Sequence, residues 1–445
     1  MYDPLHHKSP GQGAPYPASY WANISGQAPS DDGELIDEHQ VDVAIIGAGY
    51  TGLSCALHLA KEHGINATVI EANQTAWGCS GRNAGFILKS SGRKSFAQMA
   101  SQWGEEVMRG IYDEMAAGVD TINGLIAEGI DCQQQAPGYL KVAHKPSKFK
   151  ELTEIARIQQ QQFGYQVEIL SQAEVRDQYM DDQNAYGAIR YQDGFGLNPL
   201  KLAWGYHELA RKYGAKIHTS SPVINWSEEN GEQLLITPKG RIRAKKVVLA
   251  TNGYTPKGFH SLVNNRFLPV LSQIIVTEPL TEKQITDCNI LTNNVVMDTR
   301  ALKYYYRKLP DNRILFGGRG AITGKAADDP YYAHRLMKVL KTSFPALVDI
   351  KHQYAWSGWI CMALDDLPHI HHNEAQSVFY SMGYCGAGVS FSAQAGKRLA
   401  QKVAEQSVPN LPLFNKHLPK FPFAPLRRVG QWGYFQYGKI KDSYF

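Results

Sequence analysis

A glycine-rich turn between two apolar segments constrains the fold of this chain more than any other feature. Residues 42–52 read DVAIIGAGYTG, and a second apolar run, ATVIE, ends in Glu71. Residues 43–46 have the β-branched and small apolar side chains of a strand that is buried on both faces. Strand, glycines, helix, second strand and acid therefore follow one another in the order of a dinucleotide-binding unit.

Each glycine of the turn has its own physical task. Gly47 permits the tight turn out of the strand, Gly49 lets the backbone approach a diphosphate, and Gly52 lets the next helix pack close to the sheet. Residues 51–63 carry apolar side chains at helical spacing, and Gly64 is placed to end that helix. We expect the unpaired N–H groups at the start of this helix to face the phosphates.

The acid at the end of the second strand indicates which dinucleotide is bound. The Glu71 carboxylate can accept hydrogen bonds from the ribose hydroxyls of an adenosine half, and it would repel a 2′-phosphate, so NADP is disfavoured. A transmembrane interpretation of residues 41–60 is opposed by Asp42, by the turn residues and by His58. The cofactor contacts predicted for this unit are Gly47, Gly49, Tyr50, Thr51, Gly52, Glu71 and Ala72.

A second polar, glycine-rich loop follows Glu71, and it favours FAD over NAD as the cofactor. The sequence ANQTAWGCSGRNAGF stands where a nicotinamide dehydrogenase usually turns back into a third strand. A long cofactor with a diphosphate in its middle needs such a second cradle, and Arg82 can neutralise phosphate charge there. The contacts predicted in this loop are Gly78, Ser80, Gly81, Arg82, Asn83 and Ala84.

The loop GCSGRNAG resembles the GASGRNGG-like loop of the D-amino-acid-oxidase-like FAD-dependent amine and amino-acid oxidoreductases. Residues 197–223, 245–255 and 378–403 resemble later segments of that family, in the same order. The resemblance implies that the last of these ends in a glycine turn and a helix whose N-terminus points at the flavin pyrimidine carbonyl, where reduced flavin carries negative charge. It implies further cofactor contacts at Val223, Thr251, Asn252, Gly253, Gly358, Gly386, Gly388 and Val389.

Within that family the chain most resembles the branch that contains gamma-glutamylputrescine oxidoreductase. The likeness lies in PASYW at residues 17–21, in the strand-like segment 304–318 and in an aromatic, basic C-terminal tail. Glycine and D-amino-acid oxidases carry a substrate-clamping arginine where this chain has Ile360. An apolar side chain cannot pair with a carboxylate, so a simple α-amino acid loses its main anchor unless another arginine replaces it. The arginines on or near the strands of the second domain are Arg300, Arg307, Arg313 and Arg319.

Five side chains are candidates for the substrate pocket: Tyr254, Tyr305, Arg307, Trp359 and Tyr384. Tyr305 and Arg307 alternate with Tyr304 and Tyr306 along one predicted strand, so one pair faces the flavin cavity and the other pair faces away. The remaining three aromatic side chains stand in or beside cofactor-contacting segments and could offer their faces to a cationic amine. Core packing is the alternative role of each aromatic residue, and a solvated strand edge is the alternative for each arginine.

The order of these elements predicts an α/β fold with two domains. We expect a Rossmann-like FAD-binding domain of the glutathione-reductase type, and a substrate domain built from a mostly antiparallel β-sheet with helices. The predicted boundaries are an N-terminal arm (1–40), a discontinuous FAD-binding domain (41–90, 187–258 and 351–407), a substrate domain (91–186 and 259–350) and a C-terminal tail packed on the body (408–445).

Composition agrees with a cytoplasmic metabolic enzyme. The 445 residues include 46 basic and 41 acidic side chains, and the resulting net charge of +5 is too small to indicate a nucleic-acid partner. The six cysteines show no CxxC spacing, which is typical of reduced thiols, and the N-terminal residues lack the layout of a signal peptide. Cys361 is the one candidate for a covalent link to the flavin, but it falls outside the expected register, so FAD is predicted to bind non-covalently.

A histidine cluster and the basic tail are each expected to be structural. His369, His371 and His372 have no carboxylate or cysteine partner at ligand spacing, so an exposed loop is favoured over a metal site. The proline-rich tail is expected to wrap around the FAD-binding domain rather than touch a membrane.

The favoured function is FAD-dependent oxidation of an amine C–N bond. Hydride transfer from the α carbon of a neutral amine to flavin N5 would give an imine, which water hydrolyses. The expected substrate is a γ-glutamylated or otherwise substituted amine, with oxygen or another acceptor taking up the electrons. Two alternatives stay open: an amino-acid or imino-acid dehydrogenase that passes electrons to a quinone, and a flavoprotein subunit without activity of its own.

Overall fold

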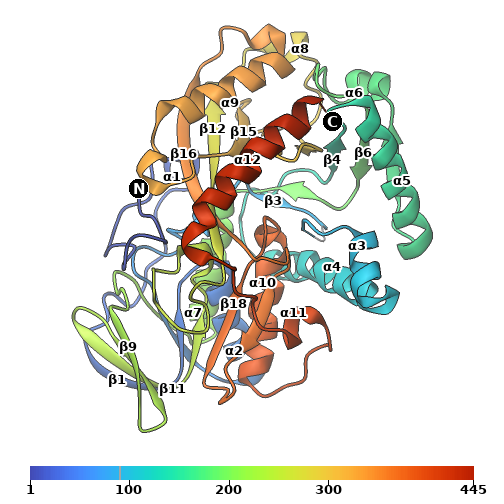
Figure 1. Ribbon diagram of the computed structural model, residues 1–445. Helices are drawn as coiled ribbons and strands as arrows, with labels where there is room; N and C mark the ends of the chain where they lie inside the picture. Colours follow the sequence, from blue (N-terminus) through green and yellow to red (C-terminus); the bar gives the residue numbers. More distant parts are fainter. Residues whose placement is uncertain (90–91, 445) are drawn as a thin grey trace.

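Two eight-stranded sheets form the body of the computed structural model, which describes residues 1–89 and 92–444 (Figure 1). The first sheet has the strand order β17–β18–β11–β1–β2–β8, with the hairpin β9–β10 attached to β11. Its strands are β1 Asp37–Ile46, β2 Ala67–Ile70, β8 Lys216–His218, β9 Asn225–Glu229, β10 Glu232–Ile236, β11 Gly240–Leu249, β17 His369–His372 and β18 Val378–Met382.

The first sheet contains the predicted dinucleotide-binding unit. β1 pairs in parallel with β2 on one side and with β11 on the other, and β11 pairs in parallel with β18. The carboxyl ends of these four strands therefore meet at one edge, which is where open α/β sheets bind ligands.

Helices cover this sheet, and glycines let them approach one another closely. α2 (Tyr50–His63) packs against α7 (Pro199–Lys212) and α10 (Gly388–Val403), and α10 also packs against α4 (Glu105–Ala127). A Cβ on Gly396 of α10 would lie 2.7 Å from the Thr51 carbonyl oxygen of α2. The predicted helix end at Gly64 is confirmed, because this residue has a left-handed φ of 67°.

The second sheet has the order β16–β12–β15–β14–β13–β4–β6–β5 and is antiparallel except for the β13–β4 pair. Its strands are β4 Tyr139–Val142, β5 Val167–Leu170, β6 Ala188–Tyr191, β12 Leu268–Thr277, β13 Val295–Asp298, β14 Tyr305–Lys308, β15 Ile314–Arg319 and β16 His352–Met362. The remaining elements of this half are α3 Phe96–Trp103, α5 Pro146–Phe163, α6 Gln172–Gln178, α8 Glu282–Asp287, α9 Pro330–Ser343 and the short pair β3 Phe86–Ile87 and β7 Phe195–Gly196. α9 packs on β12, β15 and β16.

Two strands fall outside the domains that the sequence assigned to them. β6 and β16 pair within the second sheet, although residues 187–258 and 351–407 were expected to belong to the FAD-binding domain. β16 pairs with β12 over almost its whole length, and this long-range pairing leaves no local mark in the sequence. The predicted boundary at residues 90 and 91 and the last residue, 445, lie outside the described residues, and the other boundaries stay predictions.

The N-terminal segment is integrated into the body rather than laid over it. It forms the short helix α1 (Tyr20–Ile24), and β1 already begins at Asp37, within the predicted arm. The Trp21 side chain is buried, and its indole nitrogen donates a hydrogen bond to the Asn83 carbonyl oxygen at 2.9 Å. The arm therefore braces the second glycine-rich loop.

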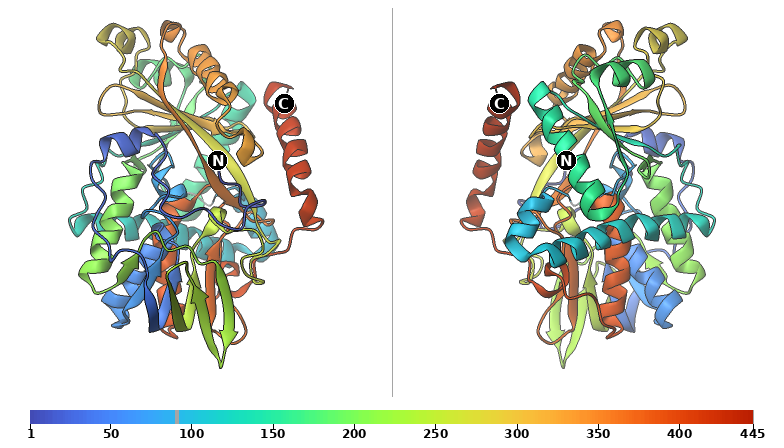
Figure 2. Two further views of the ribbon diagram at one scale, coloured as in Figure 1. Left: turned by 90° about the vertical axis from the view of Figure 1, so that its left-hand side faces the viewer. Right: turned by 90° about the vertical axis from the view of Figure 1, so that its right-hand side faces the viewer.

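The C-terminal tail does not simply wrap around the first half of the molecule. After α11 (Pro412–Asn415) it ends in the long helix α12 (Arg427–Tyr444), which runs along the outside of the body toward the second sheet (Figures 1 and 2). The Asp442 carboxylate accepts hydrogen bonds from the backbone N–H groups of Ala301 and Leu302 in the β13–β14 turn. In the described part of the chain, no helix has the length and apolar character that crossing a membrane requires.

Candidate active site

A cavity of about 340 Å³ lies where the carboxyl edge of the first sheet faces the second sheet. We call its two sides the motif wall and the sheet wall. The motif wall comprises the lining residues of the β1–α2 turn, of residues 71–84, of residues 250–256 and of residues 384–392. The sheet wall comprises Tyr139, Lys141, Ser272, Ile274, Met297, Lys303, Tyr305, Arg319, Gly358 and Ile360.

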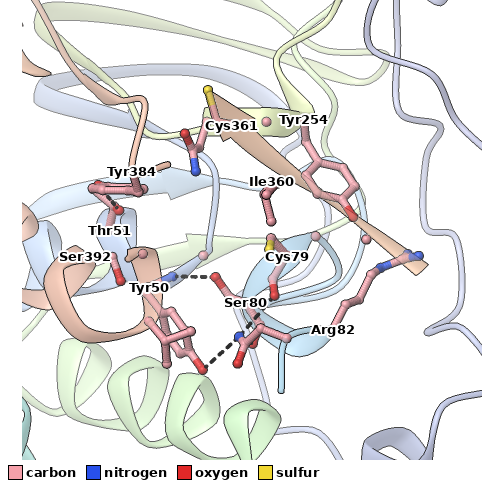
Figure 3. Close-up of a pocket in the computed structure, with 18 of the residues that line it drawn as sticks. Tyr50, Thr51, Cys79, Ser80, Arg82, Tyr254, Ile360, Cys361, Tyr384 and Ser392 are labelled. Carbon is pink, nitrogen blue, oxygen red and sulfur yellow. Dashed lines mark hydrogen bonds between the residues drawn. The ribbon is translucent and has the colours of Figure 1, made fainter. Parts of the chain in front are cut away.

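The β1–α2 turn has the geometry that the glycine spacing predicts. Gly47 has a φ of 108°, and a Cβ at this position would lie 3.0 Å from the Ala250 carbonyl oxygen. Gly49 caps α2 without any side-chain hydrogen bond, so the first N–H groups of the helix are left to other partners. The Tyr50 N–H donates to the Ser80 hydroxyl at 3.0 Å, which ties the turn to the second loop (Figure 3).

Glu71 lines the cavity at the end of β2. Its carboxylate accepts backbone hydrogen bonds from Ala48 at 2.8 Å and from Asn73 at 3.0 Å. Burial raises the pKa of Glu71, while these hydrogen bonds act in the opposite direction. The side chain is thus held in place by the backbone, and Val223 also lines the cavity.

Asn83 holds the second glycine-rich loop in shape. Its amide nitrogen donates to the carbonyl oxygens of Cys79 and Ser80, and its amide oxygen accepts from the Gly85 N–H at 2.8 Å. All of these contacts are internal to the loop. Asn83 therefore shapes the loop backbone in addition to lining the cavity.

Arg82 lines the cavity, but its guanidinium group is already engaged. Its Nε donates to the Trp77 carbonyl oxygen at 2.7 Å, and its guanidinium carbon lies 4.4 Å from the centre of the Trp77 ring. The centre of the Tyr254 ring lies 5.9 Å from the same carbon (Figure 3). The predicted contact between Arg82 and a phosphate stays a prediction.

Tyr384 connects the two ends of the motif wall. Its hydroxyl lies 2.6 Å from the Thr51 hydroxyl (Figure 3). It also lies 2.7 Å from the Ser381 hydroxyl. Burial raises the pKa of Tyr384 to about 12, so the phenol stays neutral and available for hydrogen bonding. The first turn of α2 is thereby joined to the loop that precedes α10.

The sheet wall is one face of the second sheet. Lys141 pairs with Met297, Met297 with Tyr305, and Tyr305 with Gly317, so these residues form a row across four strands. Directly paired residues project to the same face of a sheet, as do residues two positions apart. The pair Tyr305 and Arg307 is therefore the one on the cavity face, and Tyr304 and Tyr306 pack with Phe316 on the opposite face.

Two of the five predicted pocket residues, Arg307 and Trp359, do not line the cavity. Arg307 is 2% exposed and donates to the carbonyl oxygens of Ala84 and Leu197, because its part of β14 is covered by β3 and β7. Trp359 is fully buried, and its indole nitrogen donates to the Tyr2 carbonyl oxygen at 2.8 Å. Trp359 lies on the face of β16 that is opposite to Gly358 and Ile360.

Two of the predicted cofactor-contacting glycines, Gly52 and Gly81, also lie outside the lining. A Cβ on Gly52 would collide with the Gly47 carbonyl oxygen, and one on Gly81 would lie 2.5 Å from the Ala76 carbonyl oxygen. Both glycines are required by close packing of the backbone. The lining includes all the other cofactor contacts predicted from the sequence.

Sequence reasoning missed two lysines of the sheet wall, Lys141 and Lys303. Lys303 stands two residues before Tyr305, so the alternation rule could have placed both side chains on one face. Lys141 is brought there only by the β4–β13 pairing. Of the four arginines considered as replacement anchors, only Arg319 lines the cavity. Arg300 pairs with Asp298, and Arg313 pairs with Asp311.

The sequence predicted that the histidine cluster lies in an exposed loop, but it lies in a strand. β17 begins at His369 and ends at His372, and it pairs with β18. His369 is 1% exposed, and its Nε2 lies 3.1 Å from the Asp365 carboxylate, so it does have an acidic partner. No group of side chains suited to a metal ion occurs among the described residues.

The cavity fits a long dinucleotide such as FAD. The N-termini of α2 and α10 both open on it, and neither helix has a side-chain cap. Gly386, just before α10, has a φ of 99°, and a Cβ there would meet no atom within 4 Å. One uncapped helix end can receive a diphosphate, and the other can offer positive partial charge to a flavin carbonyl.

Comparison with known sequences gives an independent result. The model of the FAD dependent oxidoreductase (DAO) family matches residues 42–402. The chain is 32% identical over 407 residues to the gamma-glutamylputrescine oxidoreductase of Escherichia coli (strain K12), and the match covers 91% of this chain and 92% of that relative.

Solved structures show the same fold. Glycine oxidase from Geobacillus kaustophilus superposes with a TM-score of 0.71 at 19% identity, covering 86% of this chain and all of the other. L-Proline dehydrogenase from P. horikoshii gives a TM-score of 0.70 at 21% identity, covering 85% and 96% of the two chains. The predicted fold class is confirmed.

Proposed function

The chain belongs to the DAO family of FAD-dependent oxidoreductases, and from this premise we propose that it oxidises the C–N bond of a γ-glutamylated or similarly substituted amine. FAD, the cofactor of this family, supplies the redox chemistry by accepting a hydride from the carbon next to nitrogen. The observation that carries the proposal is the likeness to gamma-glutamylputrescine oxidoreductase, which spans both halves of the molecule.

The motif wall is suited to hold FAD along its length. The α2 N-terminus would take the diphosphate, and the Glu71 carboxylate would accept hydrogen bonds from the adenosine ribose. The α10 N-terminus would face the flavin ring, with Gly388 and Val389 closest to it. Non-covalent binding stays part of the proposal.

The sheet wall is suited to hold an amine in its neutral form. Ile274, Met297 and Ile360 give this wall an apolar surface, and desolvation lowers the pKa of a bound ammonium group. The positive side chains of the same wall act in the same direction. The nitrogen lone pair is then free, as oxidation at the adjacent carbon requires.

Ile360 supports a substituted amine over a simple amino acid. It lines the cavity at the position where glycine and D-amino-acid oxidases are expected to have their clamp arginine. An isoleucine offers no donor to a carboxylate at that position. A substrate anchored elsewhere on the wall fits this arrangement better.

Anaerobic stopped-flow mixing of the purified holoenzyme tests the proposal. The visible absorbance of the flavin should bleach with γ-glutamylputrescine faster than with putrescine, glycine, D-alanine or L-proline. Bleaching by a hydroxy acid and by none of these amines would overturn it. Reoxidation with oxygen or with a quinone analogue then identifies the acceptor class, and turnover by the purified chain alone excludes the inactive-subunit alternative.

A further inference from the structure

We propose that Lys141, Lys303 and Arg319 together form the binding site for a carboxylate that the amine substrate carries. This inference rests on the proposed function and deepens it. It makes the substrate an amine with an anionic substituent, and it makes a free diamine a poor substrate.

The second sheet brings the three cations to one surface. Lys141 lies on β4, in the row that continues through Met297 and Tyr305. Lys303 precedes Tyr305 by two residues, and Arg319 lies on the same face at the end of β15. Strand pairing therefore fixes the site, and all three side chains line the cavity.

Among the cations that line the cavity, these three differ from Arg93 because they have no counter-ion among the described residues, and they differ from Arg82, whose guanidinium group donates to the Trp77 carbonyl oxygen. Arg93, which also lines the cavity, pairs with Asp366 at 3.2 Å and donates to the Tyr434 hydroxyl at 2.7 Å. Lys141, Lys303 and Arg319 form no ion pair with any residue that the structure describes. Among the described lining residues, the only carboxylate is that of Glu71, on the motif wall.

An unpaired cluster of half-buried cations is costly, and a bound anion would relieve that cost. Burial lowers the pKa of Lys303 to about 7, with further lowering by the positive charges of Lys141, Arg93 and Arg319. Asp298 acts in the opposite direction but pairs with Arg300. Burial also lowers the pKa values of Lys141 and Arg319. A carboxylate at this position would stabilise all three charges at once.

The same charges discriminate between substrates. A free diamine carries two positive charges and is repelled by the cluster. A diamine acylated by a γ-glutamyl group has lost one of those charges and has gained an α-carboxylate together with an α-ammonium group, so its net charge is lower and it offers an anion to the cluster. In glycine and D-amino-acid oxidases, the substrate carboxylate is expected to bind at the position of Ile360 on β16. In this chain, the proposed carboxylate site lies instead on β4, on β15 and in the β13–β14 turn.

Calorimetric titration of the holoenzyme with glutarate tests the site without turnover. We expect Lys303→Met and Arg319→Met to weaken glutarate binding by at least about tenfold each. Lys303→Arg keeps the charge and should stay within about threefold of the wild type. The control is Lys283→Met on α8, where the side chain is 82% exposed and should not matter. Unchanged binding in Lys303→Met, Arg319→Met and Lys141→Met would overturn the inference.

Kinetics with a matched pair of substrates completes the test. The variants should raise KM for γ-glutamylputrescine but not for its α-carboxamide, with similar limiting rates of flavin reduction. Loss of FAD from the purified variants would instead show that the cations hold the cofactor, and the inference would fail. If no amine bleaches the flavin but glutarate binding still depends on these side chains, the proposed function fails and the anion site stands.

Discussion

The two walls of the cavity are built on opposite plans. The motif wall consists of glycines, backbone N–H groups and small polar side chains, and most of its hydrogen bonds are internal, such as those of Asn83 and Tyr384. The sheet wall consists of long side chains on one face of a sheet, and its charges lack partners. Close packing of the backbone shapes the motif wall, and the pairing register of the strands shapes the sheet wall.

Under the proposed function, this difference separates cofactor binding from substrate choice. A wall made of backbone accepts one ligand shape and tolerates few changes. A wall made of side chains can be altered one residue at a time while the sheet stays intact. Substitutions in the first should therefore affect folding and FAD content, and substitutions in the second should affect affinity for the substrate.

The largest effect should follow from adding a single methyl group to the motif wall. Gly52→Ala places a Cβ against the Gly47 carbonyl oxygen, so the turn must open. We expect loss of bound FAD and a drop in unfolding free energy of about 3 kcal/mol or more. The control is Gly124→Ala in α4, where a Cβ meets no atom within 4 Å. Flavin content after purification and urea unfolding measure both results, and a fully loaded Gly52→Ala protein would contradict the comparison.

Arg307→Met tests whether every cation on the cavity face of the sheet has the same role. The two terminal nitrogens of Arg307 donate to Gln135, Ala84 and Leu197, so removal of the side chain leaves buried acceptors without donors. The expected cost is about 2–4 kcal/mol of stability, with glutarate affinity unchanged. Arg319→Met should show the reverse pattern. Equal effects of both substitutions on glutarate binding would blur the distinction between the two arginines.

The pH dependence of stability should reveal the unpaired charge of Lys303. Its pKa is about 7 in the folded state and 10.5 in the unfolded state, so the unfolded chain binds more protons between these values. The unfolding free energy therefore rises with pH across this window, and the cost of burying the charge is fully present below about pH 7.

Lys303→Met removes this cost. The variant should be more stable than the wild type by up to a few kcal/mol near pH 6, and the difference should shrink as the pH rises toward 10.5. Urea unfolding at several pH values measures it, with Lys283→Met as the reference. A difference that does not change with pH would mean that Lys303 has its charge compensated.

The smallest effect should come from Tyr384→Phe. The substitution removes one hydroxyl and leaves the Thr51 and Ser381 hydroxyls to find other partners. We expect about 1–3 kcal/mol of lost stability and weaker FAD retention. Tyr331→Phe is the control, because the Tyr331 side chain is exposed on α9. Dialysis followed by flavin fluorescence would show the difference, and equal retention would argue against a bracing role for Tyr384.

The sequence predicted the motif wall far better than the sheet wall, for a physical reason. Gly47, Gly49 and Glu71 act through local backbone geometry, which short sequence patterns record. Lys141 reaches the cavity because β4 pairs with β13, and Trp359 leaves it because of the direction of its side chain on β16. The amino-acid sequence around a residue does not show which strand its own strand pairs with, or which face of the sheet its side chain is on. The likeness to a known family supplied the order of the elements but not these registers.

The hydrogen bond between Thr51 and Tyr384 joins residues that are 333 positions apart. Because a nascent chain emerges from its N-terminus, the first strands and α2 are available long before β18 and α10 leave the ribosome. The FAD-binding site is complete only when synthesis of the chain is almost finished. Incorporation of flavin is thus a late step in the biogenesis of this protein. Chains that terminate early are expected to contain no flavin and therefore to be colourless.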